Sequence, residues 1–113
     1  MPSSSRKDAV REYKERTPRR GVYAIRCQAT SRVWVGASTN LGAARNRAWF
    51  TLRHGLHQEA ALQAEWRTHG EAAFQYDVLD TLEDDVTPMA IPDLLKEKTR
   101  DWAARLGAPT LLL

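Results

Sequence analysis

Residues 21–58 contain five arginines and no aspartate or glutamate. Clustered guanidinium groups neutralise phosphate charge, so a basic stretch without acids favours an anionic partner, of which nucleic acid is the most common. These arginines are Arg26, Arg32, Arg45, Arg47 and Arg53. The alternative interpretation is that the basic part of the chain simply folds against an acidic part.

The charge of the whole chain is divided between its two halves. Residues 1–58 carry twelve Lys/Arg and three Asp/Glu, whereas residues 59–113 carry five and eleven, so an overall charge of +3 conceals charges of +9 and −6. No apolar run approaches the roughly 18 residues of a membrane span, and no secretory leader is evident at the start. A single cysteine, Cys27, forms no internal disulfide, and we expect it to be buried and reduced. These features predict a cytoplasmic protein of one domain with no membrane partner.

The stretch GVYAIRCQATSRVWVG, residues 21–36, predicts a β-hairpin. Two runs rich in β-branched and aromatic residues, near 21–27 and 32–36, are separated by turn formers at 28–31. Because side chains alternate along a strand, Tyr23, Ile25 and Cys27 share one face. Tyr23 and Trp34 therefore lie on adjacent strands beside the basic stretch.

Helical patterns precede and follow this hairpin. We expect a short basic helix over 5–16, and a second helix from the N-cap Asn40 to Arg53, stopped by Gly55. A third helix is expected over 58–69. A final helix lies within 91–108, and its expected inward stripe is Leu94, Leu95, Lys98, Trp102 and Leu106.

The segment AFQYDVLDTL predicts a third strand, with Phe74, Tyr76 and Val78 on one face. The expected order is helix, strand, strand, helix, helix, strand, helix. This order predicts a small α/β (α+β) domain in which a hairpin and a third strand form one sheet covered by helices.

Several short motifs, in order, resemble the GIY-YIG nuclease superfamily and in particular a bacterial branch of it. They are GVY at 21–23, WVG at 34–36, ASTNL at 37–41, GLH at 55–57, LQAEW at 62–66 and HGEAAFQYDVLD at 69–80. The resemblance covers residues 20–106, which leaves a basic N-terminal extension, 1–19, and a C-terminal tail, 107–113. It implies a three-stranded antiparallel sheet flanked by helices, in agreement with the order of elements.

The resemblance also implies an activity, the hydrolysis of DNA phosphodiester bonds with one divalent ion, usually Mg²⁺ (or Mn²⁺). The first motif tyrosine falls on Tyr23, whose phenol has an unperturbed pKa of about 10 and acts as a base only if a metal or an arginine lowers that value. The second motif tyrosine falls on Trp34. An indole donates a hydrogen bond but accepts no proton, so any role of the second hydroxyl is lost or moved.

The remaining catalytic positions of the family are partly changed in this chain. The helix arginine falls on Ala44, and we expect Arg47, or failing that Arg45, to replace it. His57 matches a histidine that often stands before the second helix, where it could contact phosphate or the attacking water. The alternative is a residue that begins the helix and hydrogen-bonds to the backbone. The metal-binding glutamate falls on Thr99, so we expect Glu97, two residues before it, to bind the metal.

Four further residues, Arg26, Arg32, Asn40 and Arg53, are expected to contact nucleic acid. The first hypothesis is therefore a metal-dependent endonuclease, a monomer or weak dimer acting on DNA. The second is a degenerate domain that binds nucleic acid without cutting it, with Trp34 or Trp49 stacking on bases if exposed. The third is a small scaffold that binds a protein partner through its acidic half and terminal leucines.

Overall fold

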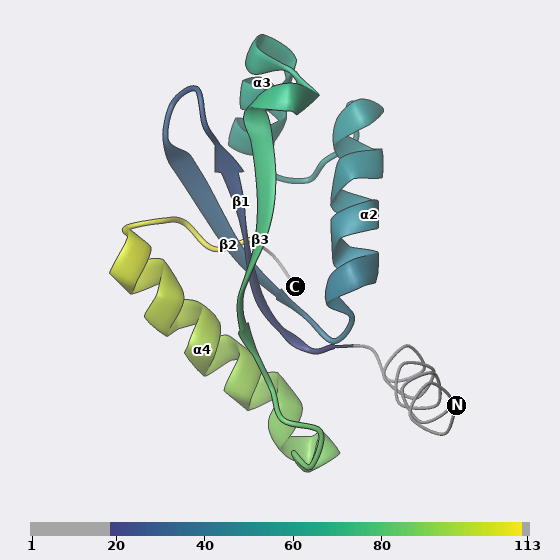
Figure 1. Ribbon diagram of the computed structural model, residues 1–113, viewed down its shortest axis with the longest axis vertical. Coiled ribbons are helices and arrows are strands. Elements are labelled where there is room, and N and C mark those ends of the chain that lie inside the picture. The colour runs from purple at the N-terminus through teal and green to yellow at the C-terminus, as the bar shows by residue number, and fades with distance from the viewer. Residues whose placement is uncertain (1–18, 112–113) are drawn as a thin grey trace, which may run out of the picture.

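The computed structural model describes residues 19–111 (Figure 1), so the helix expected over 5–16 lies outside the described residues. Two strands, β1 (Gly21–Cys27) and β2 (Arg32–Ser38), are followed by α2 (Leu41–Arg53) and α3 (Ala60–His69). A third strand, β3 (Phe74–Thr81), precedes α4 (Ile91–Leu106), and single turns of 3₁₀-helix lead into each of these two elements, at Glu71–Ala73 and Pro88–Ala90. The predicted order of elements is thereby confirmed over this part of the chain.

The three strands form one antiparallel sheet in the order β2-β1-β3, which confirms the expected α+β class. Helices α2 and α4 lie on opposite sides of this sheet (Figure 1). Tyr23 and Ile25 belong to the core on the side of α2 and α3, whereas Val22 and Val35 pack with α4. The central strand is thus apolar on both faces because each face is covered by a helix.

The pairing of β1 with β2 places Tyr23 directly opposite Gly36. A Cβ atom at position 36 would lie 2.6 Å from both the Cζ and the hydroxyl oxygen of Tyr23, so the ring occupies space that only glycine leaves free. Tyr76 of β3 stacks on the same ring with centroids 5.1 Å apart. The phenol of Tyr23 is therefore held between a glycine and a second tyrosine.

Helix boundaries follow local signals closely at one helix and less closely at another. The side chain of Asn40 accepts a hydrogen bond of 3.0 Å from the Ala43 N–H, which caps α2 as predicted. Gly55 follows this helix with a φ of 72°, a conformation that favours glycine. Helix α3 has Glu59 as its N-cap and starts at Ala60, two residues later than expected.

The inward stripe predicted for α4 was wrong at its centre. The fully buried residues of this helix are Ile91, Leu95, Thr99 and Ala103. Of the predicted set only Leu95 is buried, and the others lie along the edges of the stripe. The smaller side chains at 99 and 103 are buried, while the larger Leu94, Trp102 and Leu106 are only partly buried.

The chain after α4 returns to the sheet. The Val35 N–H donates to the Pro109 carbonyl at 3.0 Å, and the Leu111 N–H donates to the Val35 carbonyl at 2.7 Å. Leu111 is buried in the same core cluster as Tyr23. The outer edge of β2 is thus partly paired. Within residues 19–111, no helix is long and apolar enough to cross a membrane.

We predict that Gly36→Ala destabilises the protein by about 1 to 3 kcal/mol, because the added methyl group must displace a ring that Tyr76 supports from behind. Urea denaturation of the single variants and of the Gly36→Ala/Tyr23→Ala double variant measures this cost. In the Tyr23→Ala background the added methyl should cost much less. An equal cost in both backgrounds would show that the Tyr23 ring does not require the glycine.

Candidate active site

A pocket of about 290 Å³ lies between β1, α2 and the loop that leads into α3. Among the polar residues that line it are Tyr23, Arg47, His57 and Glu59. These residues come from three separate segments of the chain, which only the folded structure brings together. Three residues expected to be catalytic, Tyr23, Arg47 and His57, therefore line the same pocket.

Tyr23 contributes a largely buried phenol, with 8% of the residue exposed. Burial raises the pKa of Tyr23, and the positive charge of Arg47 lowers it by a smaller amount, so the pKa remains above 10. At neutral pH the hydroxyl is therefore protonated and both donates and accepts hydrogen bonds. Tyr76, stacked behind it, donates its own hydroxyl to the Leu41 carbonyl at 2.8 Å and serves as support.

Arg47 is the arginine of α2 that reaches this pocket, where its side chain is exposed. None of the ion pairs within residues 19–111 involves it. Arg45 instead lies over the ring of Trp49, 5.3 Å from the centroid, and lines a separate hollow with Glu71 and Tyr76. Of the two arginines expected to replace the helix arginine, the structure places Arg47 beside Tyr23.

His57 is held by two hydrogen bonds from opposite sides. Its backbone N–H donates to Oε1 of Gln63 at 3.0 Å, and its Nδ1 accepts from the Glu59 N–H at 3.0 Å. An Nδ1 that accepts carries no proton, so these hydrogen bonds assign the ring hydrogen to Nε2. Gln63 is buried and also donates to the Leu52 carbonyl at 3.0 Å, which ties this loop to the end of α2.

The electrostatic environment keeps His57 neutral. Burial lowers the pKa of His57 below 6.5, and the nearby Glu59 offsets this only in part. At neutral pH the ring is therefore an Nε2–H donor, a group that suits a phosphate oxygen.

Trp34 lies outside the pocket. It pairs with Ile25 and lies in the core on the side of α2 and α3, where 1% of the residue is exposed. In the part of the chain that the structure describes, its indole N–H has no hydrogen-bond partner. Trp49 is also buried, at 6% exposure, so the condition set for base stacking by these two residues is not met.

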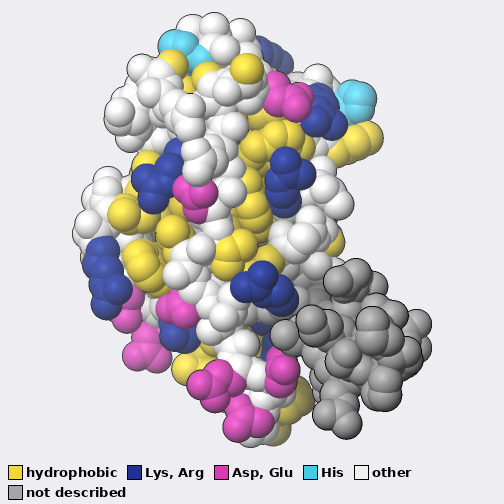
Figure 2. Space-filling view, in the orientation of Figure 1, with side chains coloured by type: hydrophobic (Ala, Val, Ile, Leu, Met, Phe, Trp, Pro, Cys, Tyr) yellow, Lys and Arg dark blue, Asp and Glu magenta, His cyan; other side chains and the backbone are white. Residues whose placement is uncertain are grey.

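The other expected nucleic-acid contacts have partners within the chain. Arg26 pairs with Asp77 at 2.8 Å, Arg32 with Glu65 at 3.1 Å, and Arg53 with Glu71 at 2.7 Å, while Asn40 caps α2. For these three arginines the acidic half of the chain does fold against the basic half. The pairs are partly exposed and therefore weak enough for a phosphate to compete with them. Other acidic side chains gather over the loop between β3 and α4, at the lower end of Figure 2.

The structure does not bring the expected metal ligand to the pocket. Glu97 is exposed on α4 and is not among the residues that line the pocket. Thr99, on which the family's glutamate falls, is buried, but its hydroxyl donates to the Leu95 carbonyl and it lines a different hollow beside Leu111. The family position is thus buried and lacks a carboxylate.

Glu59 supplies a carboxylate that was not expected from the sequence. It lines the pocket two residues after His57. The available signal was its place as the first acid after the acid-free stretch, at the start of α3. One carboxylate together with substrate phosphate oxygens meets the needs of a Mg²⁺ ion, so Glu59 fits the metal that the resemblance implies.

Comparison with known proteins identifies the fold. No protein-family model and no curated protein matches the chain. Two solved structures do: the catalytic domain of the homing endonuclease I-TevI, and a glutamate-to-alanine mutant of the catalytic domain of intron endonuclease I-TevI. The first has a TM-score of 0.69 at 22% identity and covers 83% of this chain and 99% of that one. The second has a TM-score of 0.67 at 24% identity and covers 79% and 84%.

At this level of identity the likeness concerns the fold. The chain has the α+β fold of the I-TevI catalytic domain, which is the fold that the resemblance in the motifs implied.

We predict that folding stability falls as the pH drops below about 6.5, and that His57 contributes to this loss. Because the pKa of His57 is lower in the folded state, the unfolded chain binds the proton first and gains from acidification. Urea denaturation at pH 7.5 and 5.5 should show a smaller loss for His57→Gln than for wild type. A His57 pKa at or above 6.5 in an NMR titration would contradict this assignment.

Proposed function

We propose that the chain is a metal-dependent endonuclease that hydrolyses DNA phosphodiester bonds in the pocket of Tyr23, Arg47 and His57. The observation that carries this proposal is that two motif-matched residues, Tyr23 and His57, line one pocket together with Arg47, the expected replacement for the helix arginine. The fold supports it, since the two similar solved structures are described as catalytic domains of an endonuclease. The substrate class, the metal requirement and the catalytic roles belong to the proposal.

Each of the three residues has a distinct task in this reaction. Arg47, without an ion pair among the described residues, binds the scissile phosphate and neutralises its charge. His57 donates its Nε2–H to a phosphate oxygen. Tyr23 keeps its proton at neutral pH and orients the attacking water through its hydroxyl.

Glu59 is the residue that would hold the divalent ion. When bound, Mg²⁺ or Mn²⁺ supplies charge stabilisation at the phosphate and a water of lowered pKa. The raised pKa of the Tyr23 phenol disfavours a role as the base, so this residue would position the water and leave activation of the water to the ion held by Glu59.

A second candidate function is binding of nucleic acid without cleavage. Thr99 and Ala44 stand where the family has a glutamate and an arginine, and this double loss favours the second candidate. Binding would then depend steeply on salt, because released counterions drive it, and would need no metal.

We predict that purified protein with Mg²⁺ or Mn²⁺ cuts labelled DNA, and that Arg47→Ala and His57→Gln each reduce the single-turnover rate by at least about 100-fold. Tyr23→Phe should also reduce the rate. Two matched controls, Arg45→Ala and His54→Gln, change exposed residues of the same types outside the pocket and should retain most activity.

The result that would overturn the proposal is intact single- and double-stranded DNA at high enzyme excess with either ion. If DNA still binds under those conditions and binding weakens steeply with salt, the second candidate is correct. If Arg45→Ala lost cleavage and Arg47→Ala retained it, the phosphate would bind instead in the hollow lined by Arg45 and Tyr76.

We predict that Glu59→Gln raises the Mg²⁺ concentration needed for half-maximal cleavage by at least about tenfold, because one ligand charge is lost. Glu97→Gln is the matched change on the exposed side of α4 and should leave that concentration unaltered. A larger effect of Glu97→Gln than of Glu59→Gln would show that Glu97, the ligand expected from the sequence, binds the metal.

A further inference from the structure

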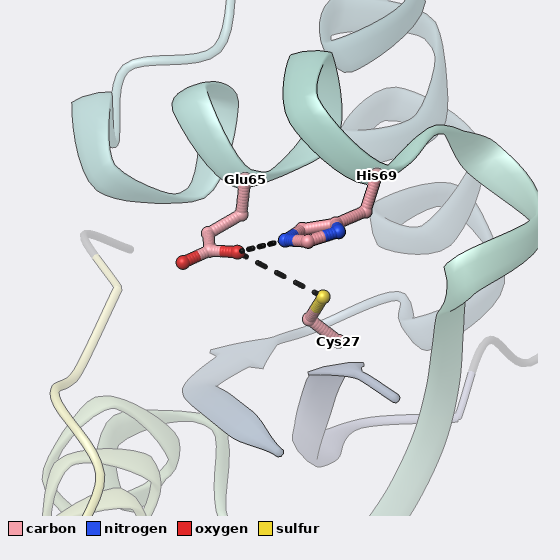
Figure 3. Close-up of side chains that lie close together, drawn as sticks. All are labelled: Cys27, Glu65 and His69. Atoms are coloured by element: carbon pink, nitrogen blue, oxygen red, sulfur yellow. Dashed lines mark hydrogen bonds and ion pairs between the residues drawn. The ribbon is translucent and has the colours of Figure 1, made fainter. Parts of the chain in front are cut away.

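Three side chains of the types that ligate metals lie close together (Figure 3), at the end of β1 that is farther along the chain from Tyr23. They are Cys27, the last residue of β1, and Glu65 and His69, one turn apart on α3. One carboxylate oxygen, Oε2 of Glu65, is 3.9 Å from Sγ of Cys27 and 3.3 Å from Nε2 of His69. We propose that these three residues bind a zinc ion at a site separate from the candidate active site.

The spacing of the donor atoms suits a tetrahedral ion. Typical zinc bond lengths of about 2.0 to 2.3 Å place neighbouring ligand atoms about 3.3 to 3.6 Å apart. The His69 to Glu65 distance already has this value, and the Cys27 to Glu65 distance exceeds it by a few tenths of an ångström. All three donor atoms lie within 4.8 Å of one another, so the site needs only small side-chain movements.

The chemistry of the donors selects the ion. A thiolate, an imidazole and a carboxylate suit Zn²⁺, whereas Mg²⁺ prefers oxygen ligands alone. Three protein ligands leave a fourth position for water. This site is therefore distinct in kind from the one proposed at Glu59.

Arg32 positions the shared ligand. Its guanidinium binds the other carboxylate oxygen of Glu65, Oε1, at 3.1 Å, and so turns Oε2 toward Cys27 and His69. A partner that fixes a metal-binding carboxylate in this way is usual at zinc sites. Arg32 contacts only Oε1 of Glu65, so the second carboxylate oxygen remains available to an ion.

The location of the site gives the ion a structural role. Cys27 is fully buried, whereas the side chain of His69 is 29% exposed. A bound ion would fasten the last turns of α3 to the end of β1. The same helix carries Gln63, which holds His57, so the zinc site stabilises the helix that supports the pocket.

The test uses the full chain freed of metal with a chelator and then titrated with Co²⁺ or Zn²⁺. One equivalent of Co²⁺ should produce the visible bands of a tetrahedral ion together with a thiolate-to-metal charge-transfer band in the near ultraviolet. Zn²⁺ should displace Co²⁺ and raise the Tm by at least about 5 °C. Neither readout involves DNA, so the outcome is independent of nuclease activity.

Variants of each ligand assign the site. Cys27→Ser should abolish the charge-transfer band, and Glu65→Gln and His69→Gln should each weaken Zn²⁺ binding by more than about 100-fold. The control His54→Gln changes an exposed histidine of α2's C-terminal cap and should bind as wild type does. If Cys27→Ser fails to fold, the two α3 variants still decide, since their side chains lie at or near the surface.

Two results would overturn the proposal. One is the absence of a charge-transfer band in the folded wild-type protein at saturating Co²⁺. The other is Zn²⁺ binding of equal affinity in wild type and His69→Gln, which would place the ion elsewhere and leave the three side chains as a hydrogen-bonded cluster.

Discussion

The contact between the ring of Tyr23 and the backbone of Gly36 is the constraint on which the arrangement of this molecule depends. A side chain at position 36 would occupy the space of the phenol, so β2 can pair with β1 only where a glycine meets this ring. That register also places Trp34 opposite Ile25, on the face covered by α2 and α3. The position that resembles a second active-site tyrosine thus becomes part of the core, while Tyr23 stays at the wall of the pocket.

Helix α3 contributes side chains both to the support of the pocket that contains Tyr23 and to the cluster at Cys27, the last residue of β1. Near its start, the buried amide of Gln63 joins the end of α2 to the backbone of His57, which fixes the pocket loop. Near its end, Glu65 and His69 meet Cys27 at the opposite end of the strand. Removing Gln63 would leave buried polar groups without partners, so the position of His57 depends on the packing of this whole helix.

The two oppositely charged halves of the chain form ion pairs with each other in the folded protein, and these pairs occupy some of the arginines. Acidic residues of the second half pair with Arg26, Arg32 and Arg53. Burial keeps Tyr23 and His57 neutral at physiological pH. Among the described residues that line the pocket, Arg47 is the one arginine, and it lies with two neutral hydrogen-bonding groups and the carboxyl group of Glu59.

Local sequence signals by themselves determined the order of the elements, the shared face of Tyr23 and Ile25, the cap at Asn40 and the motif spacing that pointed to Tyr23 and His57. These properties depend on neighbours within a few residues. The sequence already favoured Arg47 over Arg45, but only the tertiary structure placed Arg47 beside Tyr23, buried Trp34, brought Glu59 into the pocket and turned Thr99 toward the sheet. A helix can rotate about its axis without any change in its own sequence, so the direction of each side chain is decided by the surface against which the helix packs.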